Sequence, residues 1–261
     1  MLKDLNILEL DIEKKLKDLI QERLDAPQHL LFESARYSLL SPGKRLRPIL
    51  TLATAQTFNI PLENALIPAC ALEMVHTYSL IHDDLPCIDD DDLRRGIPTL
   101  HKVYNEGHAV LTGDYLLTYA FELLSTSPHL TSDQKIALVK SLSQHAGGDG
   151  MIGGQVMDIL KSGNWEEMHL LKTAALMISA LEFGAIISNC SPSDTAHLKI
   201  FGKQIGLAFQ IIDDILDGDM PPEARSQADQ LYTSALHSLS QLSRPAPLLE
   251  HLAYKLIHRT T

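Results

Sequence analysis

The sequence predicts an all-α fold in a single domain that spans residues 1–261. Apolar residues recur at three- and four-residue steps through most of the chain, and the apolar–polar alternation of half-buried strands is nearly absent. Proline and glycine clusters interrupt this pattern and indicate where helices end. They lie at 41–48, Pro61, 86–98, Pro128, 145–150, 191–192, 221–222 and 245–247. We therefore expect roughly eight to ten helices with short connections, as is usual for helical bundles.

The helices can be assigned in order along the chain. The first carries apolar residues at helical spacing: Leu5, Leu8, Ile12, Leu16, Leu19 and Ile20. The next boundary is SPGKRLRP at 41–48, where a helix can begin after Gly43. The apolar run HTYSLI at 76–81 indicates a buried helix that leads into an acidic segment, and LAFQIIDDILD at 207–217 indicates a further core helix.

Composition and charge narrow the classes of protein. A chain of 261 residues, 45% of them hydrophobic, can bury a large core in one domain. The net charge of −11 argues against nucleic acid as the main partner, because a phosphate backbone is bound by a basic surface. Three widely spaced cysteines without a CxxC pair indicate a reducing, cytoplasmic location. The sequence shows no signal-peptide pattern and no apolar run of about 18 residues, so we expect a soluble protein without a transmembrane segment.

The first segment that indicates chemistry is DDLPCIDDDDLRRG at 83–96. Its aspartates are Asp83, Asp84, Asp89, Asp90, Asp91 and Asp92. Carboxylates at this density repel one another, and those at the end of a buried helix need compensation by a cation. Oxygen-only ligands suit magnesium, which typically joins one or two carboxylates to substrate phosphates. A solvated acidic turn is the alternative, and the apolar lead-in and the pair Arg94–Arg95 count against it.

The second acidic segment lies in the predicted core helix at 207–217. Asp213 and Asp217 are four residues apart and share one helix face, and Gln210 lies one turn earlier. Aspartates on the inward side of a core helix are typical of metal ligands rather than of a solvated surface. A single DDxxD is a weak signal, and the presence of two such clusters is the informative feature.

Basic residues that suit a diphosphate lie elsewhere in the chain. SPGKRLRP supplies Lys44, Arg45 and Arg47 at the start of a helix, where guanidinium groups and free backbone N–H groups can bind phosphate oxygens. His76 lies seven residues before Asp83 and therefore on the same helix face. A basic surface turn and a core histidine are the alternatives. Lys172–Thr173 could also reach a diphosphate, although an N-terminal helix position explains the threonine equally well.

Taken together, these motifs resemble the trans-isoprenyl diphosphate synthase family, most closely its bacterial farnesyl diphosphate synthases. The matching pieces occur in family order over most of the chain. They are GKRLRP (43–48), DDLPCIDDDDLRRG (83–96), the GD of LTGDYLL (111–117), GGQVMD (153–158), KTAAL (172–176) and LAFQIIDDILD (207–217). The resemblance implies about ten helices around a deep central cavity, with the two aspartate motifs facing each other at its mouth. It also implies a homodimer.

The resemblance further implies a role for each matching residue. Three magnesium ions, or manganese as a substitute, would be bound by Asp83, Asp84, Asp89, Asp213, Asp214 and Asp217. Isopentenyl diphosphate would be bound without metal by Gly43, Lys44, Arg47, His76 and Arg95. The allylic diphosphate would be bound by Arg94, Lys172, Thr173 and Gln210. Among these residues, Asp83, Asp89, Lys172 and Asp213 would be the catalytic ones. The implied reaction is the head-to-tail condensation of isopentenyl diphosphate with dimethylallyl or geranyl diphosphate to give farnesyl diphosphate.

Product length is predicted to depend on residues one to two turns before Asp83. Tyr78 is five positions before it, and Ser79 follows. In the family that the chain resembles, an aromatic residue there, together with two extra residues inside DDLPCID, is typical of enzymes that stop at fifteen carbons. Plain core packing is the alternative for Tyr78. A geranylgeranyl diphosphate synthase is the alternative product class.

Two connections depart from the family pattern. After DDILD the chain runs directly into GDMPPEARSQADQLY, which has no match for the GDxxxLGK lysine that covers the allylic diphosphate. The stretch between Met157 and Lys172 is also several residues short. Both places are mobile lids in the family, so we expect that residues are missing there from the ordered chain. If the chain is truly short at these two places, we expect its activity to be poor. The missing lysine makes a non-catalytic partner subunit one alternative. A terpene cyclase is another alternative, but it binds a single diphosphate, and the basic motif GKRLRP indicates a second diphosphate site.

Overall fold

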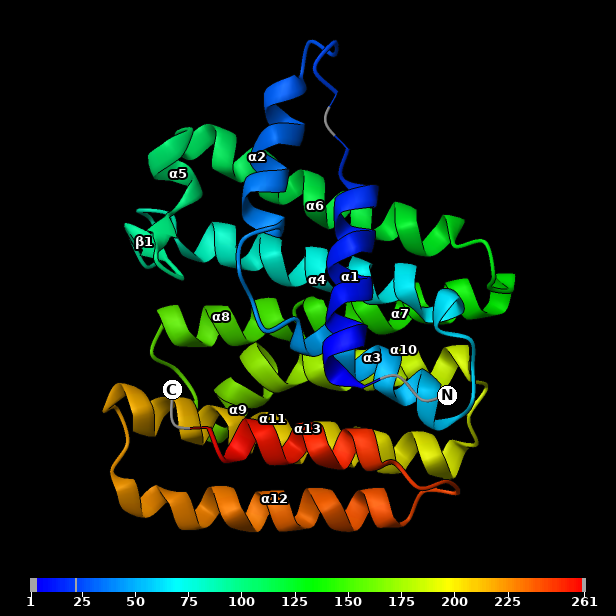
Figure 1. Ribbon diagram of the computed structural model, residues 1–261. Helices are drawn as coiled ribbons and strands as arrows, with labels where there is room; N and C mark the ends of the chain where they lie inside the picture. Colours follow the sequence, from blue (N-terminus) through cyan, green and yellow to red (C-terminus); the bar gives the residue numbers. More distant parts are fainter. Residues whose placement is uncertain (1–3, 22, 260–261) are drawn as a thin grey trace. The chain divides into compact units, whose positions relative to one another are not determined.

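The computed structural model describes residues 4–21 and 23–259, and it confirms the all-α fold (Figure 1). The α-helices are α1 (Leu5–Leu19), α2 (His29–Leu39), α3 (Leu46–Thr57), α4 (Leu62–Asp83), α5 (Leu100–Val103), α6 (Glu106–Thr126), α7 (Ser132–Ala146), α8 (Met151–Ile159), α9 (Trp165–His169), α10 (Ala175–Ile187), α11 (Pro192–Asp217), α12 (Arg225–Ser240) and α13 (Pro247–Ile257). A π-helical turn, η1 (Leu170–Ala174), joins α9 to α10, and a 3₁₀ turn, η2 (Pro222–Ala224), precedes α12.

The described residues form two compact units. Unit 1 comprises residues 4–49 and 66–129, and unit 2 comprises residues 50–65 and 130–259. The boundaries cut α3 and α4, so that the first residues of α3 belong to unit 1 and the rest of that helix to unit 2. The single domain and the central cavity expected from the sequence stay predictions.

Unit 1 is built on α4 and α6. Hydrogen bonds between side chains tie α2 to α6, where the Ser34 hydroxyl lies 2.8 Å from that of Thr112. At Gly113 of α6, an added Cβ would lie 2.1 Å from Nε2 of His82, so a glycine lets the two helices approach closely. Leu8, Ile12 and Leu16 are fully buried, as the periodicity of the first helix predicts. Helix α4 continues through Pro68.

A two-stranded antiparallel hairpin follows the first acidic segment, and the sequence did not indicate it. Strands β1 (Leu93–Arg94) and β2 (Ile97–Pro98) pair through Arg94 and Ile97. The two residues of its turn, Arg95 and Gly96, have φ of 55° and 81°. A two-residue hairpin turn with both φ values positive matches the twist of the strands. Arginine is unusual at the first of these positions, which explains why the pattern was missed.

Unit 2 packs α11 against α10, α12 and α13, and Figure 1 shows α11, α12 and α13 running side by side. Helix α10 is mostly apolar and largely buried, and its one charged residue, Glu182, pairs with Lys199. At Gly184 of α10 an added Cβ would lie 2.4 Å from Cβ of Thr54, so the C-terminal part of α3 lies directly against α10. The Thr51 hydroxyl donates a hydrogen bond to the carbonyl of Ala180 over 2.9 Å, which fixes the same contact.

One helical stretch of the described residues, Trp165–Ile187, has the length and hydropathy of a membrane span, with a mean hydropathy of 1.7. The sequence did not lead us to expect such a stretch. Because 61% of its most apolar 18-residue window is buried inside the protein, it has the character of a core helix.

Every predicted break falls between two helices. The chain leaves α2 after Leu39 and starts α3 at Leu46, and the break at 191–192 is the start of α11 with Pro192 at its first position. The connection at residues 160–164 lacks proline and was missed. It turns instead through Lys161 and Gly163, whose φ values are 50° and 78°.

Candidate diphosphate and magnesium site

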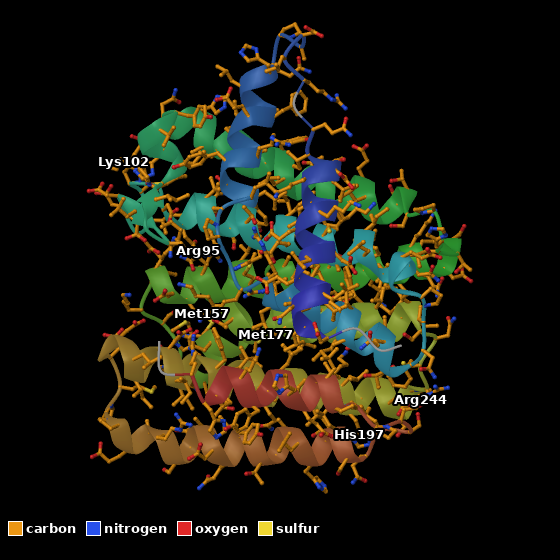
Figure 2. The ribbon with its side chains drawn as sticks, viewed as in Figure 1. Arg95, Lys102, Met157, Met177, His197 and Arg244 are labelled. Atoms are coloured by element: carbon orange, nitrogen blue, oxygen red, sulfur yellow. The ribbon has the colours of Figure 1, made fainter. Side chains whose placement is uncertain are left out.

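The basic residues predicted for isopentenyl diphosphate come together in unit 1, around the start of α3. Arg95, labelled in Figure 2, donates a hydrogen bond from Nη1 to the carbonyl of Pro42 over 2.9 Å. This bond places the hairpin turn against the loop before α3. Gly43 leaves room for this side chain, since a Cβ there would lie 2.2 Å from Nη1 of Arg95. Lys44 is exposed.

These basic groups lie close enough to shift the pKa values of one another. Burial lowers the pKa of Arg47 to about 10, with Glu73 opposing and Arg95 adding to the effect. Burial, followed by Arg47 and Arg95, holds the pKa of His76 well below its ordinary value. His76 is therefore neutral at pH 7 and retains one N–H that can donate to a phosphate.

The first acidic cluster is paired with an arginine. Asp84 is 4% exposed and accepts hydrogen bonds from Nε and Nη2 of Arg94 at 2.8 and 2.5 Å. Arg94 also donates to Asp91 over 2.8 Å. Burial raises the pKa of Asp84, and Arg94 opposes that rise. Asp83 is partly buried at the end of α4, whereas Asp89 is exposed.

A small cavity of about 30 Å³ lies beside this pair, lined in part by Asp84, Arg94 and Arg95. This volume holds one or two water molecules.

The second acidic cluster in unit 2 is held by donors from three elements. Asp213 forms an ion pair with Arg259 at 2.5 Å, and the Arg259 guanidinium lies 4.2 Å from the ring centre of Phe209. Asp214 accepts hydrogen bonds from Nε1 of Trp165 at 2.8 Å and from Nε2 of Gln210 at 2.7 Å.

Thr173 lies beside this cluster, and Asp217 is its remaining member. The Thr173 hydroxyl donates to Oε1 of Gln210 over 3.0 Å, which links the π-helical turn to α11. Asp217 is exposed at the end of α11, just before Gly218 in the left-handed conformation.

Lys172 lies in the π-helical turn, so the N-terminal helix position considered for Thr173 is wrong. The helical run begins at Trp165 and widens by one residue per turn at Leu170–Ala174. The Lys172 ammonium pairs with Asp158 at 2.6 Å and lowers the pKa of that carboxyl. Gly154 permits this arrangement, because a Cβ there would lie 2.2 Å from the backbone nitrogen of Lys172.

A profile of the Polyprenyl synthetase family matches residues 28–241. The chain belongs to the polyprenyl synthetase family. It is 47% identical over 197 residues to the chloroplastic geranylgeranyl pyrophosphate synthase of Capsicum annuum, covering 72% of this chain and 53% of that one. It is 45% identical over 204 residues to the farnesyl diphosphate synthase of Bacillus subtilis (strain 168), covering 75% and 69% of the two chains. The chain thus spans about half to two thirds of the length of these relatives.

Among solved structures, the apo FPP/GFPP synthase of Zymomonas mobilis is similar with a TM-score of 0.91 and 37% identity, covering 97% of both chains. This likeness supports the isoprenoid synthase fold for this polyprenyl synthetase family member.

The residues present fit magnesium in their chemistry. Among residues 4–21 and 23–259, no three histidine, cysteine or acidic side chains are already grouped as a metal cage. Magnesium needs only one or two carboxylates and takes its other ligands from water and substrate phosphates. The carboxylates of Asp84, Asp213 and Asp214 are paired with arginine, indole and amide N–H groups, which a cation would replace. Asp83, Asp84 and Asp89 in unit 1, and Asp213, Asp214 and Asp217 in unit 2, are the residues that would hold it.

Both connections that differ from the family pattern are continuous in this chain. Residues 160–164 join α8 to α9, and residues 218–221 join α11 to η2. The interpretation that residues are missing at these two points stays a prediction. The connection after Asp217, residues 218–221, contains no lysine.

Several residues that contact the site were not foreseen. Asp158 lies within the recognised GGQVMD motif, yet no role was assigned to it. Glu73 is the one acid in the apolar run ALIPACALEMV at 65–75, which is a recognisable signal. Trp165 and Arg259 come from distant elements and carry no local signal.

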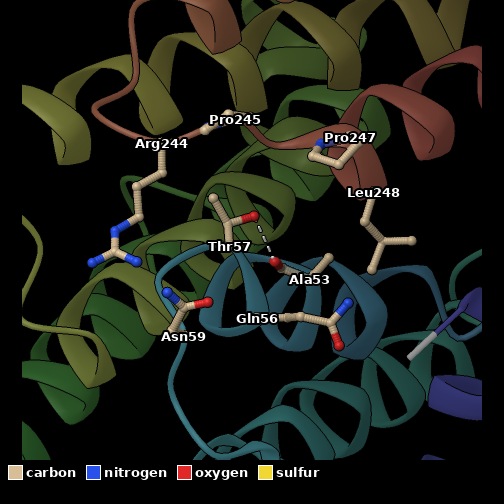
Figure 3. Close-up of a pocket in the computed structure, with 8 residues that line it drawn as sticks. All are labelled: Ala53, Gln56, Thr57, Asn59, Arg244, Pro245, Pro247 and Leu248. Carbon is tan, nitrogen blue, oxygen red and sulfur yellow. Dashed lines mark hydrogen bonds between the residues drawn. The ribbon is translucent and has the colours of Figure 1, made fainter. Parts of the chain in front are cut away.

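A different pocket, of about 270 Å³, lies in unit 2 between the end of α3 and the loop before α13 (Figure 3). Its lining includes Gln56, Asn59 and Arg244 and none of the predicted site residues. It has no carboxylate, so it does not suit magnesium.

Proposed function

We propose that the protein is a prenyltransferase that condenses isopentenyl diphosphate with dimethylallyl or geranyl diphosphate to give farnesyl diphosphate. The observation that carries this proposal is the basic cluster of Arg47, His76 and Arg95 at the start of α3. It is a diphosphate site without aspartates, in addition to the aspartate clusters. Two kinds of diphosphate site favour a two-substrate condensation over a cyclase.

In the proposed mechanism, the residues of the chain act mainly by charge. Magnesium, when bound by the aspartates, supplies positive charge that stabilises the leaving diphosphate. Arg94 and Lys172 add fixed positive charge to that group as the allylic carbon–oxygen bond breaks. Thr173 and Gln210 orient it by hydrogen bonds. Gly43, Lys44, Arg47, His76 and Arg95 hold isopentenyl diphosphate, whose double bond forms the new carbon–carbon bond. The departing diphosphate accepts the proton that is lost.

The test is to incubate the chain with magnesium, isopentenyl diphosphate and each of dimethylallyl, geranyl and farnesyl diphosphate. Product lengths are then measured after extraction. We expect a fifteen-carbon product from the first two allylic substrates. Products of twenty carbons would favour a geranylgeranyl diphosphate synthase, as both classes occur among the relatives. If no allylic substrate is condensed with isopentenyl diphosphate, the proposed prenyltransferase activity is refuted.

A second candidate function is that of a partner subunit that modulates another prenyl synthase. The lack of a lid lysine in the short connection after Asp217 favours it, because the allylic diphosphate then loses one cation. Turnover measurements distinguish the two candidate functions. A partner subunit has little activity alone and changes the activity of a second family member when the two are mixed. We also propose, from the family alone, a cytoplasmic homodimer that does not bind nucleic acid.

A further inference from the structure

Arg45 is a buried charge beside the proposed isopentenyl diphosphate site, and the reaction gives it no role. It is 2% exposed. Its guanidinium donates to Glu13 of α1 at 2.5 Å, to Glu73 of α4 at 2.9 Å and to the carbonyl of Ser41 at 2.8 Å. A single side chain thus joins two helices and the loop that precedes α3.

The backbone of Arg45 is held in an unusual conformation. Its φ of 44° lies in the left-handed region, which disfavours residues other than glycine. Its carbonyl accepts from the backbone N–H of Ile49 over 3.1 Å, the bond that starts α3. The three hydrogen bonds of the side chain therefore hold the residue at which the chain turns into the helix. Strain of this kind persists only where the surroundings determine the conformation.

The position of Arg45 determines where its neighbours lie. Gly43, two residues earlier, lies against Arg95, and Arg47, two residues later, is in the first turn of α3. Glu73 interacts with Arg45, Arg47 and Arg95. The same carboxylate therefore anchors Arg45 and balances the charges of the site, so that like charges can remain together when no diphosphate is bound.

We infer that Arg45, anchored by Glu13 and Glu73, is a positioning residue for the diphosphate of isopentenyl diphosphate. It sets the geometry of Gly43, Arg47 and the free N–H groups at the start of α3 without touching the substrate. This inference rests on the proposed function. A buried ion cluster is weak evidence for stability, because well-packed apolar residues often serve as well. The arrangement is better explained by preorganisation of a site, which tolerates little displacement.

The test uses Arg45→Lys, which keeps the charge but cannot reach three acceptors with a rigid fork. Isopentenyl diphosphate binding is measured by calorimetry in EDTA, where only the metal-free site can bind, and KM for each substrate is measured with magnesium. We expect the Kd and the KM for isopentenyl diphosphate to rise about tenfold. The KM for geranyl diphosphate should stay within about twofold, and kcat should change little.

Arg23→Lys is the matched control, since Arg23 is an exposed arginine of unit 1 that lies 4.9 Å from the ring centre of Phe32. It should change neither KM. If Arg45→Lys does not fold, Glu13→Gln removes only the negative charge of the partly exposed anchor and should give a smaller rise in KM, confined to isopentenyl diphosphate.

Two results would overturn the inference. A folded Arg45→Lys that binds isopentenyl diphosphate like the unaltered protein would remove the positioning role. An equal rise in both KM values would show a general structural role instead. If the unaltered protein neither binds isopentenyl diphosphate in EDTA nor forms product, the proposed function itself fails, and the inference fails with it.

Discussion

At the scale of single residues, Tyr78 contributes a ring rather than a hydroxyl. It is 5% exposed, and its ring packs edge-on against His82 at 5.6 Å. Its hydroxyl is buried without a hydrogen-bond partner among the described residues, and burial raises its pKa to about 12. The neighbouring hydroxyl of Ser79 donates to the carbonyl of His76. The space that Tyr78 fills is therefore the property that can limit product length.

We expect Tyr78→Ala to shift products to chains longer than fifteen carbons, because the cavity that it opens accepts further isoprene units. Tyr78→Phe is the matched control, since it keeps the ring and removes only the unbonded hydroxyl. It should retain the original product length. The measurement is chromatography of extracted products. Identical products from all three proteins would contradict the chain-length role.

His76 should make stability depend on pH in a defined direction. Its folded pKa lies well below the unfolded value of about 6.5, so the unfolded chain binds more protons between those two values. The contribution of His76 to the free energy of unfolding is therefore fully present above about pH 6.5. It is lost as the pH falls from about 6.5 through the lower pKa of the folded state. We expect His76→Gln to reduce the difference in urea unfolding free energy between about pH 7 and pH 5.

The charged groups that face His76 are arginines, which do not titrate in this range. Substitution of the exposed His129 by Gln is the control and should leave the difference unchanged. An unaltered slope in the His76 variant would show that other groups cause the acid sensitivity.

At the scale of elements, the contact of α8 with the π-helical turn depends on Gly154. A methyl group there would meet the backbone nitrogen of Lys172, which cannot rotate away. We expect Gly154→Ala to destabilise the fold by about 1–3 kcal/mol and to lower activity, because the turn that carries Lys172 must shift. Gly148→Ala is the control, since a Cβ at Gly148 would meet nothing within 4 Å. The measurements are the thermal unfolding and the turnover of both variants. Equal stability and equal turnover of the two variants would contradict the packing argument.

The boundaries of the elements were largely predictable from proline and glycine, as at α11, which begins at Pro192. The hairpin turn and the connection at 160–164 were not, because arginine and lysine adopt positive φ there. The π-helical turn also has no sequence signal, since its residues would suit an ordinary α-helix. Local propensity predicts where a helix stops, whereas tertiary contacts determine such exceptions.

At the scale of the whole molecule, the acidic clusters of a chain with net charge −11 are stabilised by internal donors. The motifs indicated which residues belong to the candidate site. They did not indicate the partners, because Arg259 and Asp213 are distant in sequence. The side chain of Arg259 is 11% exposed and that of Asp213 is 33% exposed, so removing the guanidinium would leave a partly buried carboxylate without this partner.

The proposed function requires Arg259 to leave Asp213 when magnesium and a diphosphate bind. We therefore expect Arg259→Met to lower the Tm of the ligand-free protein and to enlarge the rise in Tm on adding magnesium with inorganic pyrophosphate. A bound ligand stabilises by RT ln(1 + [L]/Kd), and loss of the competing guanidinium lowers Kd.

Arg225→Met is the control, because Arg225 forms an exposed pair with Asp229 on α12. Its ligand-induced rise in Tm should equal that of the unaltered protein. A smaller rise in the Arg259 variant would show that Arg259 assists the ligand instead of competing with it.

The hydrogen bond from Trp165 to Asp214 has a spectroscopic consequence. Trp165 is the only tryptophan of the chain, its indole N–H is bonded to Asp214, and its ring centre lies 4.6 Å from that of His169. All tryptophan emission therefore originates beside the second acidic cluster. A cation that takes Asp214 from the indole changes the emission of the unlabelled protein, so occupancy of this cluster can be titrated by fluorescence without any substrate turnover.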